Sequence, residues 1–215
     1  MCSIVGSFSK EKFTELMQLN QFRGNFSYSV SLYNIIDKKI TFQSKSFGEY
    51  SSKVLDILDT TNCYVIGHVQ APTGGLTQDT TRIHPTNAEN TFLWHNGIIT
   101  SRGIKNLQKT LGSQDTFDTL LLNKSISQNF DSLSEIEGLF TCLFVDENKG
   151  KVNIFRTKHG KLFVDEDLNI SSEKFKNSKC INYDTVYELD FINKKLNIIQ
   201  KFKTLRYNII IEGEL

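Results

Sequence analysis

The 215-residue sequence lacks several features that would place it in a specialised class of protein. It has no apolar run near the about 20 residues that a membrane-spanning helix needs, and residues 1–10 lack the basic start and apolar stretch of a secretory signal. The formal net charge is only +1, and acidic and basic residues alternate without a block of either sign. Since binders of nucleic acid and of acidic membranes carry basic patches, we expect neither nucleic acid nor a membrane as a partner.

Cysteine is scarce and lacks the paired spacing of a metal or disulfide framework. The four cysteines are Cys2, Cys63, Cys142 and Cys180, and no two of them form a CxxC motif. We therefore expect a reduced, cytoplasmic protein without a metal site or another cofactor. The apolar, strand-like surroundings of Cys63, Cys142 and Cys180 predict three small buried side chains rather than reactive thiols.

Proline is scarcer still, with only Pro72 and Pro85 in the whole chain. Both lie in or next to residues 74–90, which show no clear hydrophobic periodicity and are predicted to form a long loop. Because long loops inside compact domains are usually functional, this stretch is a candidate site region.

Hydrophobic periodicity predicts strands at both ends of the chain, with helices in its early and middle parts. The predicted helices cover residues 10–19, 104–111 and 116–126. The predicted strands cover residues 3–8, 25–36, 40–47, 63–69, 91–94, 139–145, 152–156, 162–164, 186–189, 196–201 and 207–211. This order lacks strict βαβ alternation, so we expect an α+β fold of antiparallel sheets packed with helices, in one domain over residues 1–215.

Cys2 can supply both a nucleophile and a base once Met1 is removed. Methionine aminopeptidases remove Met1 when the next side chain is small, and cysteine qualifies. The mature chain would then begin with a thiol beside a free α-amine, whose reference pKa of about 7.7–8.0 lets it take the thiol proton near neutral pH. The alternative is a cysteine that merely begins a buried strand.

Two short segments combine glycines with polar groups at predicted strand ends. Residues 67–75 read GHVQAPTGG, which offers close backbone approach and a hydroxyl, or else an ordinary tight turn. Residues 94–97 read WHNG, in which the Asn96 amide and the unhindered Gly97 N–H are a ready pair of donors for an oxyanion. Asn-Gly is also a strong signal for a hairpin turn, so that alternative stays open.

Taken together, the order and spacing of these motifs resemble the class II glutamine amidotransferases, which are N-terminal nucleophile (Ntn) hydrolases. The motifs are CSIVG at residues 2–6, GHVQAPTGG at 67–75, HP at 84–85 and HNGII at 95–99, with weaker matches at 117–122, 137–140 and 171–173. The resemblance implies a four-layer αββα sandwich of two antiparallel sheets between helices.

The resemblance also implies a catalytic mechanism. In this family the N-terminal cysteine, which here is Cys2, attacks the side-chain amide of glutamine, and its own α-amine acts as the base. A γ-glutamyl thioester forms, and water then releases glutamate. Asn96 and Gly97 match the positions that form the oxyanion hole in this family.

Three further residues match positions at which the family binds its substrate. Thr73 matches the threonine near the substrate carboxylate, and His84 matches a residue that lines the pocket through its backbone. Asp118 matches the acid that holds the substrate α-ammonium group. Asp115 is a rival because it begins the same Asp-Thr dipeptide, but only Asp118 is followed by the three leucines of the family pattern.

Gln70 departs from the family pattern, which has an arginine that pairs with the α-carboxylate of glutamine. A glutamine side chain supplies neither the positive charge nor the bidentate fork, and Ala71 replaces a bulky aromatic residue. Three interpretations stay open. Another cation such as Arg82 or Arg102 takes over, the substrate is a different amide, or the glutaminase is weakened and the chain is a binding protein that keeps the fold.

Most members of the family carry a synthase domain that uses the ammonia, and this sequence shows none. The residues after 175 have the hydrophobic pattern of strands that finish the same domain. The sequence therefore favours a glutamine amidotransferase that hydrolyses glutamine and supplies ammonia to a separate synthase. An Ntn amidohydrolase for a related amide is the main alternative.

Overall fold

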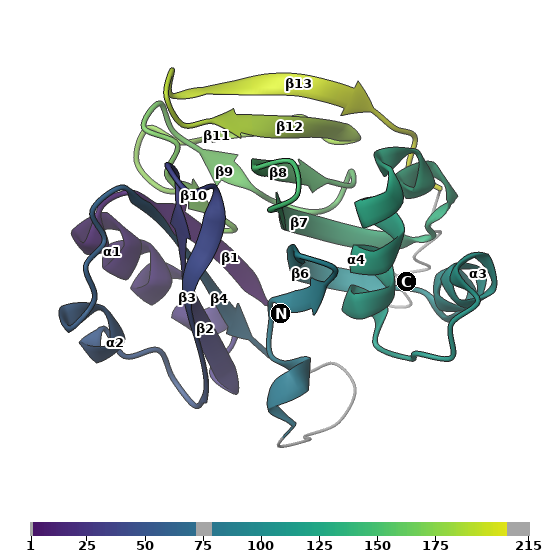
Figure 1. The fold of residues 1–215 in the computed structure, drawn as a ribbon, viewed down its shortest axis with the longest axis horizontal. Coiled ribbons are helices and arrows are strands. Elements are labelled where there is room, and N and C mark those ends of the chain that lie inside the picture. Colours follow the sequence, from purple (N-terminus) through teal and green to yellow (C-terminus); the bar gives the residue numbers. More distant parts are fainter. Residues whose placement is uncertain (1, 72–78, 206–215) are drawn as a thin grey trace, which may run out of the picture.

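In the computed structural model, which describes residues 2–71 and 79–205, two antiparallel β-sheets pack face to face and helices cover their outer faces (Figure 1). Helix α1 (Lys10–Asn20) lies over the first sheet, whereas α3 (Ser101–Leu111) and α4 (Asp118–Gln128) lie over the second. The order of layers is helix, sheet, sheet, helix. The predicted α+β class and the four-layer αββα sandwich are therefore confirmed.

The first sheet has seven strands in the order β11-β9-β10-β1-β4-β2-β3. β1 lies in the middle beside β4, with Ser3 opposite Val69, and this register places Cys2 beside Gln70 at the end of β4. The strands are β1 (Ser3–Ser7), β2 (Ser27–Asn34), β3 (Lys39–Phe47), β4 (Cys63–Gln70), β9 (Phe163–Val164), β10 (Ile170–Ser171) and β11 (Lys179–Cys180).

The second sheet has six strands in the order β13-β12-β8-β7-β6-β5. Its longest pairing joins β6 to β7, where Asn96 is opposite Thr141 and Gly97 is opposite Phe140. The strands are β5 (Thr86–Ala88), β6 (Thr91–Ile99), β7 (Gly138–Asp146), β8 (Lys151–Arg156), β12 (Thr185–Asp190) and β13 (Lys195–Lys201).

Two of the helices, α1 and α3, begin after side chains that accept hydrogen bonds from their first free N–H groups. The Ser9 hydroxyl accepts a hydrogen bond from the Lys12 N–H ahead of α1, and the Thr100 hydroxyl accepts one from the Gly103 N–H ahead of α3. The remaining helical segments are α2 (Lys53–Asp56) and the 3₁₀ helices η1 (Gln21–Arg23), η2 (Thr80–Arg82) and η3 (Phe130–Glu135). Across the described ranges, no helix is long and apolar enough to cross a membrane.

The inner faces of the two sheets form one apolar core, and this core orients the ends of two strands. Its fully buried members include Ile4, Ile66, Trp94, Leu143 and Ile154. Because side chains alternate along a strand, residues two positions away from these point to the same side. Cys2 lies two residues before Ile4 and Asn96 lies two residues after Trp94, so both face the space between the sheets.

Helix α1 packs closely on the outer face of the first sheet because β4 carries a glycine beneath it. A Cβ atom at Gly67 would lie 2.5 Å from the Phe13 ring and 2.6 Å from the Met17 sulfur. The absence of this atom lets both side chains of α1 reach the sheet, where they join a buried cluster with Val5 and Val65.

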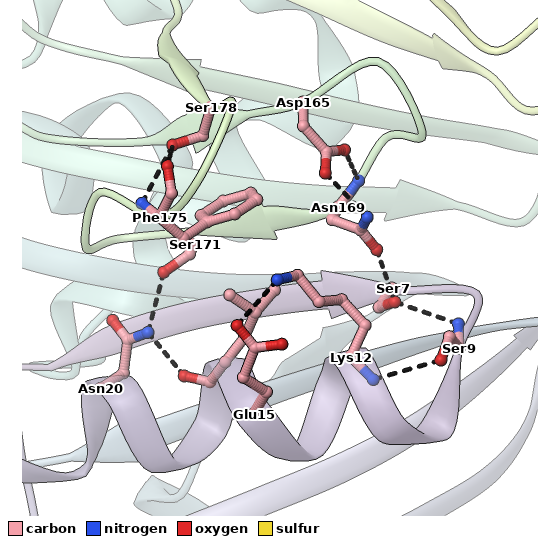
Figure 2. A network of polar contacts seen from close by, with 11 residues as sticks. Ser7, Ser9, Lys12, Glu15, Asn20, Asp165, Asn169, Ser171, Phe175 and Ser178 are labelled. Carbon is pink, nitrogen blue, oxygen red and sulfur yellow. Dashed lines mark hydrogen bonds and ion pairs between the residues drawn. The ribbon is translucent and has the colours of Figure 1, made fainter.

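Buried polar contacts fasten β1 and α1 to a segment far along the chain (Figure 2). The Ser7 hydroxyl donates to Asn169 Oδ1 at 2.6 Å, and Asn169 Nδ2 donates to an Asp165 carboxylate oxygen at 2.9 Å. At the other end of α1, Asn20 Nδ2 donates to Ser171 Oγ at 2.8 Å. These bonds fix β10 against β1, so that the residue after Ser171 lies beside the beginning of β1.

The structure corrects three details that periodicity predicts. β6 runs to Ile99, so the strand end predicted at residue 94 is wrong and residues 95–97 lie inside a strand rather than in a hairpin turn. Residues 74–90, predicted as one loop, contain η2 and β5. Cys63 and Cys142 are buried as predicted, but Cys180 is exposed because β11 is an edge strand. The strand predicted at residues 207–211 lies outside the described residues.

Replacing Ile154 by alanine is expected to lower the free energy of unfolding by about 2–5 kcal/mol, because its side chain is fully buried between the sheets. Ile192 is 90% exposed, so Ile192→Ala is the matched control and should change stability by about 0.5 kcal/mol or less. Urea unfolding measures both variants. Equal effects would contradict the placement of Ile154 in the core.

Candidate active site

Cys2 lies at the beginning of β1, where backbone and side-chain contacts hold it. Its Sγ atom is 3.5 Å from the carbonyl oxygen of Ala71, and its own carbonyl oxygen accepts a hydrogen bond of 3.0 Å from Arg23 Nε. Arg23 in turn forms a buried ion pair with Glu173. The backbone of the candidate nucleophile is therefore anchored to two other segments of the chain.

The surroundings of Cys2 favour a protonated thiol in the resting state. Burial raises the pKa of the Cys2 thiol above its ordinary value, and the nearby negative charge of Asp118 raises it further. The positive charge of Arg23 acts in the opposite direction but does not cancel the burial. A thiol in this environment needs a base that removes its proton as it attacks.

Asn96 faces Cys2 across the gap between the sheets, and a serine connects the two strands. Ser172 Oγ accepts a hydrogen bond of 3.0 Å from the Ile4 N–H of β1 and one of 3.5 Å from Asn96 Nδ2 of β6. The Asn96 amide is thus linked through Ser172 to β1, the strand that follows Cys2.

Gly97 occupies a position that no other residue could take without moving the neighbouring strand. Its φ angle is +153°, and a Cβ atom there would lie only 2.0 Å from the carbonyl oxygen of Leu139 on β7. Gly97 follows Asn96 within the continuous strand β6. The amide side chain of Asn96 lies on the inner face of the sheet.

Asp118 is the first residue of α4 and points toward β6. Its Oδ1 atom accepts a hydrogen bond of 2.7 Å from the Thr119 N–H, and its Oδ2 atom lies 4.0 Å from His95 Nδ1. The rival Asp115 is bound elsewhere, because its carboxylate pairs with Lys124 at 2.6 Å and this hydrogen bond lowers the pKa of Asp115. The geometry favours Asp118 over Asp115 as a site residue.

Three buried histidines contact one another, and two of them also contact Thr119 near the beginning of α4. His68 Nε2 is 3.0 Å from the carbonyl oxygen of His95, and the rings of His68 and His84 have centroids 4.3 Å apart. His84 Nε2 and His95 Nδ1 lie 2.9 Å and 3.0 Å from the hydroxyl of Thr119. Burial lowers the pKa of all three rings, and that of His68 to about 3, so they are neutral at physiological pH.

Both polar atoms of the Gln70 side chain form hydrogen bonds within the protein. Its Oε1 atom accepts a hydrogen bond of 3.3 Å from the Ser27 hydroxyl, and its Nε2 atom donates one of 3.2 Å to the carbonyl oxygen of Arg82. The Arg82 guanidinium lies over the ring of Phe117, 5.6 Å from its centroid. Arg102 is 81% exposed and lies 3.8 Å from Glu137, so each of the two arginines contacts a residue other than Cys2.

The structure places most of the predicted site residues around one region. In the first sheet, Cys2 precedes β1 and lies beside Gln70 at the end of β4. Asn96 and Gly97 lie on β6 of the second sheet. His84 and Asp118 both contact Thr119. Thr73 lies outside the described residues. Within residues 2–71 and 79–205, no group of three or more His, Cys, Asp or Glu side chains could hold a metal ion.

Sequence reasoning missed four residues that complete this region. They are Arg23, Thr119, Ser172 and Glu173. Ser172 and Glu173 belong to a segment that matches the family pattern weakly, which was a usable signal. Arg23 follows a predicted helix without any motif, and only the fold brings its side chain to the Cys2 carbonyl.

Comparison with known proteins supports the fold. No family model matches the sequence, and no curated protein matches it. Among solved structures, the chain resembles the glutamine phosphoribosylpyrophosphate (PRPP) amidotransferase from B. subtilis complexed with ADP and GMP, with a TM-score of 0.68 and 16% identity. It also resembles a structure described as the allosteric regulatory enzyme of purine biosynthesis, with a TM-score of 0.66 and 15% identity.

Both similarities cover 94% of this chain but only 49% of the neighbour. The chain therefore spans about half the length of these enzymes. At 16% and 15% identity, the similarity establishes the fold. The predicted resemblance to an Ntn-type glutamine amidotransferase domain is therefore confirmed as a resemblance in fold.

Replacing Gly97 by alanine is expected to lower the free energy of unfolding by about 2–4 kcal/mol, because the added Cβ would collide with Leu139. Gly112 has a positive φ of +61° with nothing within 4 Å, so Gly112→Ala carries the conformational cost alone, about 1–2 kcal/mol. Chemical unfolding of the two variants compares them. A Gly97→Ala protein as stable as the control would contradict the close approach of β6 and β7.

Proposed function

We propose that the chain hydrolyses the side-chain amide of glutamine through a thioester on Cys2. After removal of Met1, the α-amine of Cys2 takes the thiol proton as sulfur attacks the amide carbon. The carbon–nitrogen bond then breaks, the proton passes to the departing nitrogen, and ammonia leaves. Water next adds to the γ-glutamyl thioester, the carbon–sulfur bond breaks, and glutamate and the free thiol are formed.

The observation that carries this proposal is the link through Ser172 between Asn96 on β6 and β1, the strand that follows Cys2. Ser172 receives hydrogen bonds from both strands, and the Asn96 side chain faces the gap in which an amide bound to Cys2 would lie. The Asn96 amide and the Gly97 N–H would stabilise the oxyanion formed in each addition step. The raised pKa of the buried Cys2 thiol supports an adjoining base, which the α-amine would provide.

Substrate recognition would use the polar groups around this gap. Asp118 would bind the α-ammonium group of glutamine, since it lies at the N-terminus of α4 close to Cys2. Thr73 and the backbone of His84 would line the pocket near the α-carboxylate. Gln70 would border the carboxylate as a neutral neighbour, because its amide is already bound to Ser27 and Arg82.

The ammonia would pass to a synthase on a separate chain. The B. subtilis neighbour is named for both glutamine and PRPP, and the present chain corresponds to about half of its length. We propose that this chain carries out only the glutamine step. Its partners would then be glutamine and a synthase that binds the ammonia acceptor.

Gln70 favours one alternative, an Ntn amidohydrolase that acts on a different amide. A neutral amide beside Cys2 provides no positive charge for an α-carboxylate, and Ala71 contributes no bulk. An amide without a free carboxylate at this position would suit such a pocket. The nucleophile, the base and the oxyanion hole would be the same in both reactions.

Replacement of Cys2 by alanine in the Met1-free protein is expected to abolish glutamate release from glutamine, because no other side chain can form the thioester. Asn96→Ala should lower kcat by about 10²–10³-fold through loss of one oxyanion donor. The exposed Cys180 offers a matched control, and Cys180→Ala should keep full activity. Coupled assay of glutamate measures all three. Glutaminase activity that survives Cys2→Ala would exclude the mechanism.

Replacement of Gln70 by arginine is expected to raise kcat/KM for glutamine by about tenfold, because a charge-assisted pair with the carboxylate is worth about 1.5–3 kcal/mol against about 1 kcal/mol for a neutral hydrogen bond. Gln70→Leu is the control, since it removes both hydrogen bonds of Gln70 without adding charge. Steady-state kinetics on glutamine measure both variants. An unchanged kcat/KM in Gln70→Arg would show that the carboxylate does not lie beside Gln70.

A further inference from the structure

The hydroxyl group of Thr119 is the centre of a buried polar cluster. This hydroxyl has no role in the reaction proposed above. Thr119 is 1% exposed, and its Oγ1 atom lies 2.9 Å from His84 Nε2, 3.0 Å from His95 Nδ1 and 3.2 Å from Asp118 Oδ1. Each of the three contacts comes from a different segment of the chain. Only one of them can receive the single hydroxyl proton.

The proton positions in this cluster follow from which ring atoms have partners. His68 Nε2 faces the carbonyl oxygen of His95, which can only accept, so this nitrogen carries the proton of His68. Among the described residues, the remaining ring atoms His68 Nδ1, His84 Nδ1 and His95 Nε2 are buried without a hydrogen-bond partner. A proton on any of these atoms would be a buried unpaired donor, which is costly and rare.

The same reasoning assigns the protons of the other two rings. His84 carries its proton on Nε2 and His95 carries it on Nδ1, and both N–H groups donate to Thr119 Oγ1. These two bonds fill the acceptor positions of the hydroxyl oxygen, and the hydroxyl proton is left for Asp118 Oδ1. The opposite assignment would place the hydroxyl lone pairs against the carboxylate and leave a ring N–H unpaired.

We propose that Thr119 is a positioning residue that fixes the Asp118 carboxylate for the α-ammonium group of glutamine, with His84 and His95 directing its hydroxyl proton. This inference rests on the proposed function, in which Asp118 binds that group. Asp118 Oδ1 then accepts two hydrogen bonds from Thr119, one from the N–H and one from the hydroxyl. Oδ2 is left to face the ligand.

The charges packed around the cluster agree with neutral rings. Lys45 and Asp118 are the charged groups that act on the rings, and the Cys142 thiol opposite His95 on β7 is neutral because burial raises its pKa. Burial lowers the pKa of His84 and His95, and although the charge of Asp118 raises that of His95, the burial outweighs it. A protonated ring would have to place its second N–H at an atom that has no hydrogen-bond partner within residues 2–71 and 79–205.

The proton assignment can be tested on the unmodified protein by two-bond ¹H–¹⁵N correlation of the imidazole rings at pH 7. His68 and His84 should appear as the Nε2–H tautomer and His95 as the Nδ1–H tautomer. Because burial lowers the pKa of all three rings, each should become charged only at a pH below the ordinary histidine pKa of about 6.5. The exposed His159 serves as the internal reference. The opposite tautomer at His84 or His95 would overturn the proposal, because the hydroxyl would then donate to that ring.

Kinetics on two substrates separate a positioning role from a structural one. Thr119→Val, which removes the hydroxyl at nearly constant volume, should lower kcat/KM for glutamine about tenfold or more, mainly through KM. It should leave kcat/KM unchanged for 4-carbamoylbutanoate, which is glutamine without the α-amino group. Thr119→Ser, which keeps the hydroxyl, should restore the preference for glutamine.

Equal losses on both substrates in Thr119→Val would overturn the positioning role. Because this variant also leaves two buried ring N–H groups unpaired, its stability is measured alongside, and the tautomer measurement does not depend on it. If the unmodified protein hydrolyses neither substrate, the proposed function fails. The tautomer pattern alone then decides whether Thr119 holds Asp118.

Discussion

The packing of the two sheets against each other is the constraint on which the candidate site depends. Ile4 on β1 and Trp94 on β6 are both fully buried in the core between the sheets. Strand alternation then turns Cys2 and Asn96, each two residues away, into the same space where the apolar core ends. A shift of either strand by one residue would turn its polar group to the opposite face of its sheet. The core thus sets the register, and the register turns the candidate nucleophile Cys2 and the Asn96 amide toward the same space.

The same alternation divides the WHNG segment between two faces of the second sheet. Trp94 and Asn96 point inward, whereas His95 points outward to Thr119 on α4. Gly97 would also point outward, but there β7 leaves no room for a side chain. One short strand segment therefore contributes to the apolar core, the gap beside Cys2 and the contacts of α4. Asp118 acquires its place through those contacts, because His95 and Thr119 join the beginning of α4 to β6.

Periodicity predicted the long elements well because their burial follows a simple pattern. The helix predicted at residues 10–19 is α1, and the strands at residues 63–69 and 139–145 are β4 and β7. Residues 95–97 were open to two interpretations, since Asn-Gly commonly forms hairpin turns and the pairing with β7 that extends β6 is not local. Cys180 looked apolar from its neighbours, but its exposure depends on β11 being at a sheet edge. Arg23 carries no local signal, because its partner Cys2 comes from a distant segment, whereas Thr119 lies in a segment with a weak match to the family pattern.

The two ends of a bound glutamine would meet very different surroundings. On the proposed function, the ammonium group would meet a carboxylate whose position is set by Thr119 and by two neutral imidazoles. The carboxylate group would meet Gln70, whose amide is bound to Ser27 and Arg82 and is not free to follow the ligand. A rigid, partly buried carboxylate discriminates against ligands that lack the matching donor, whereas a neutral border discriminates weakly between charged and uncharged groups. Selectivity in such a site would therefore come mainly from the amino group of the substrate.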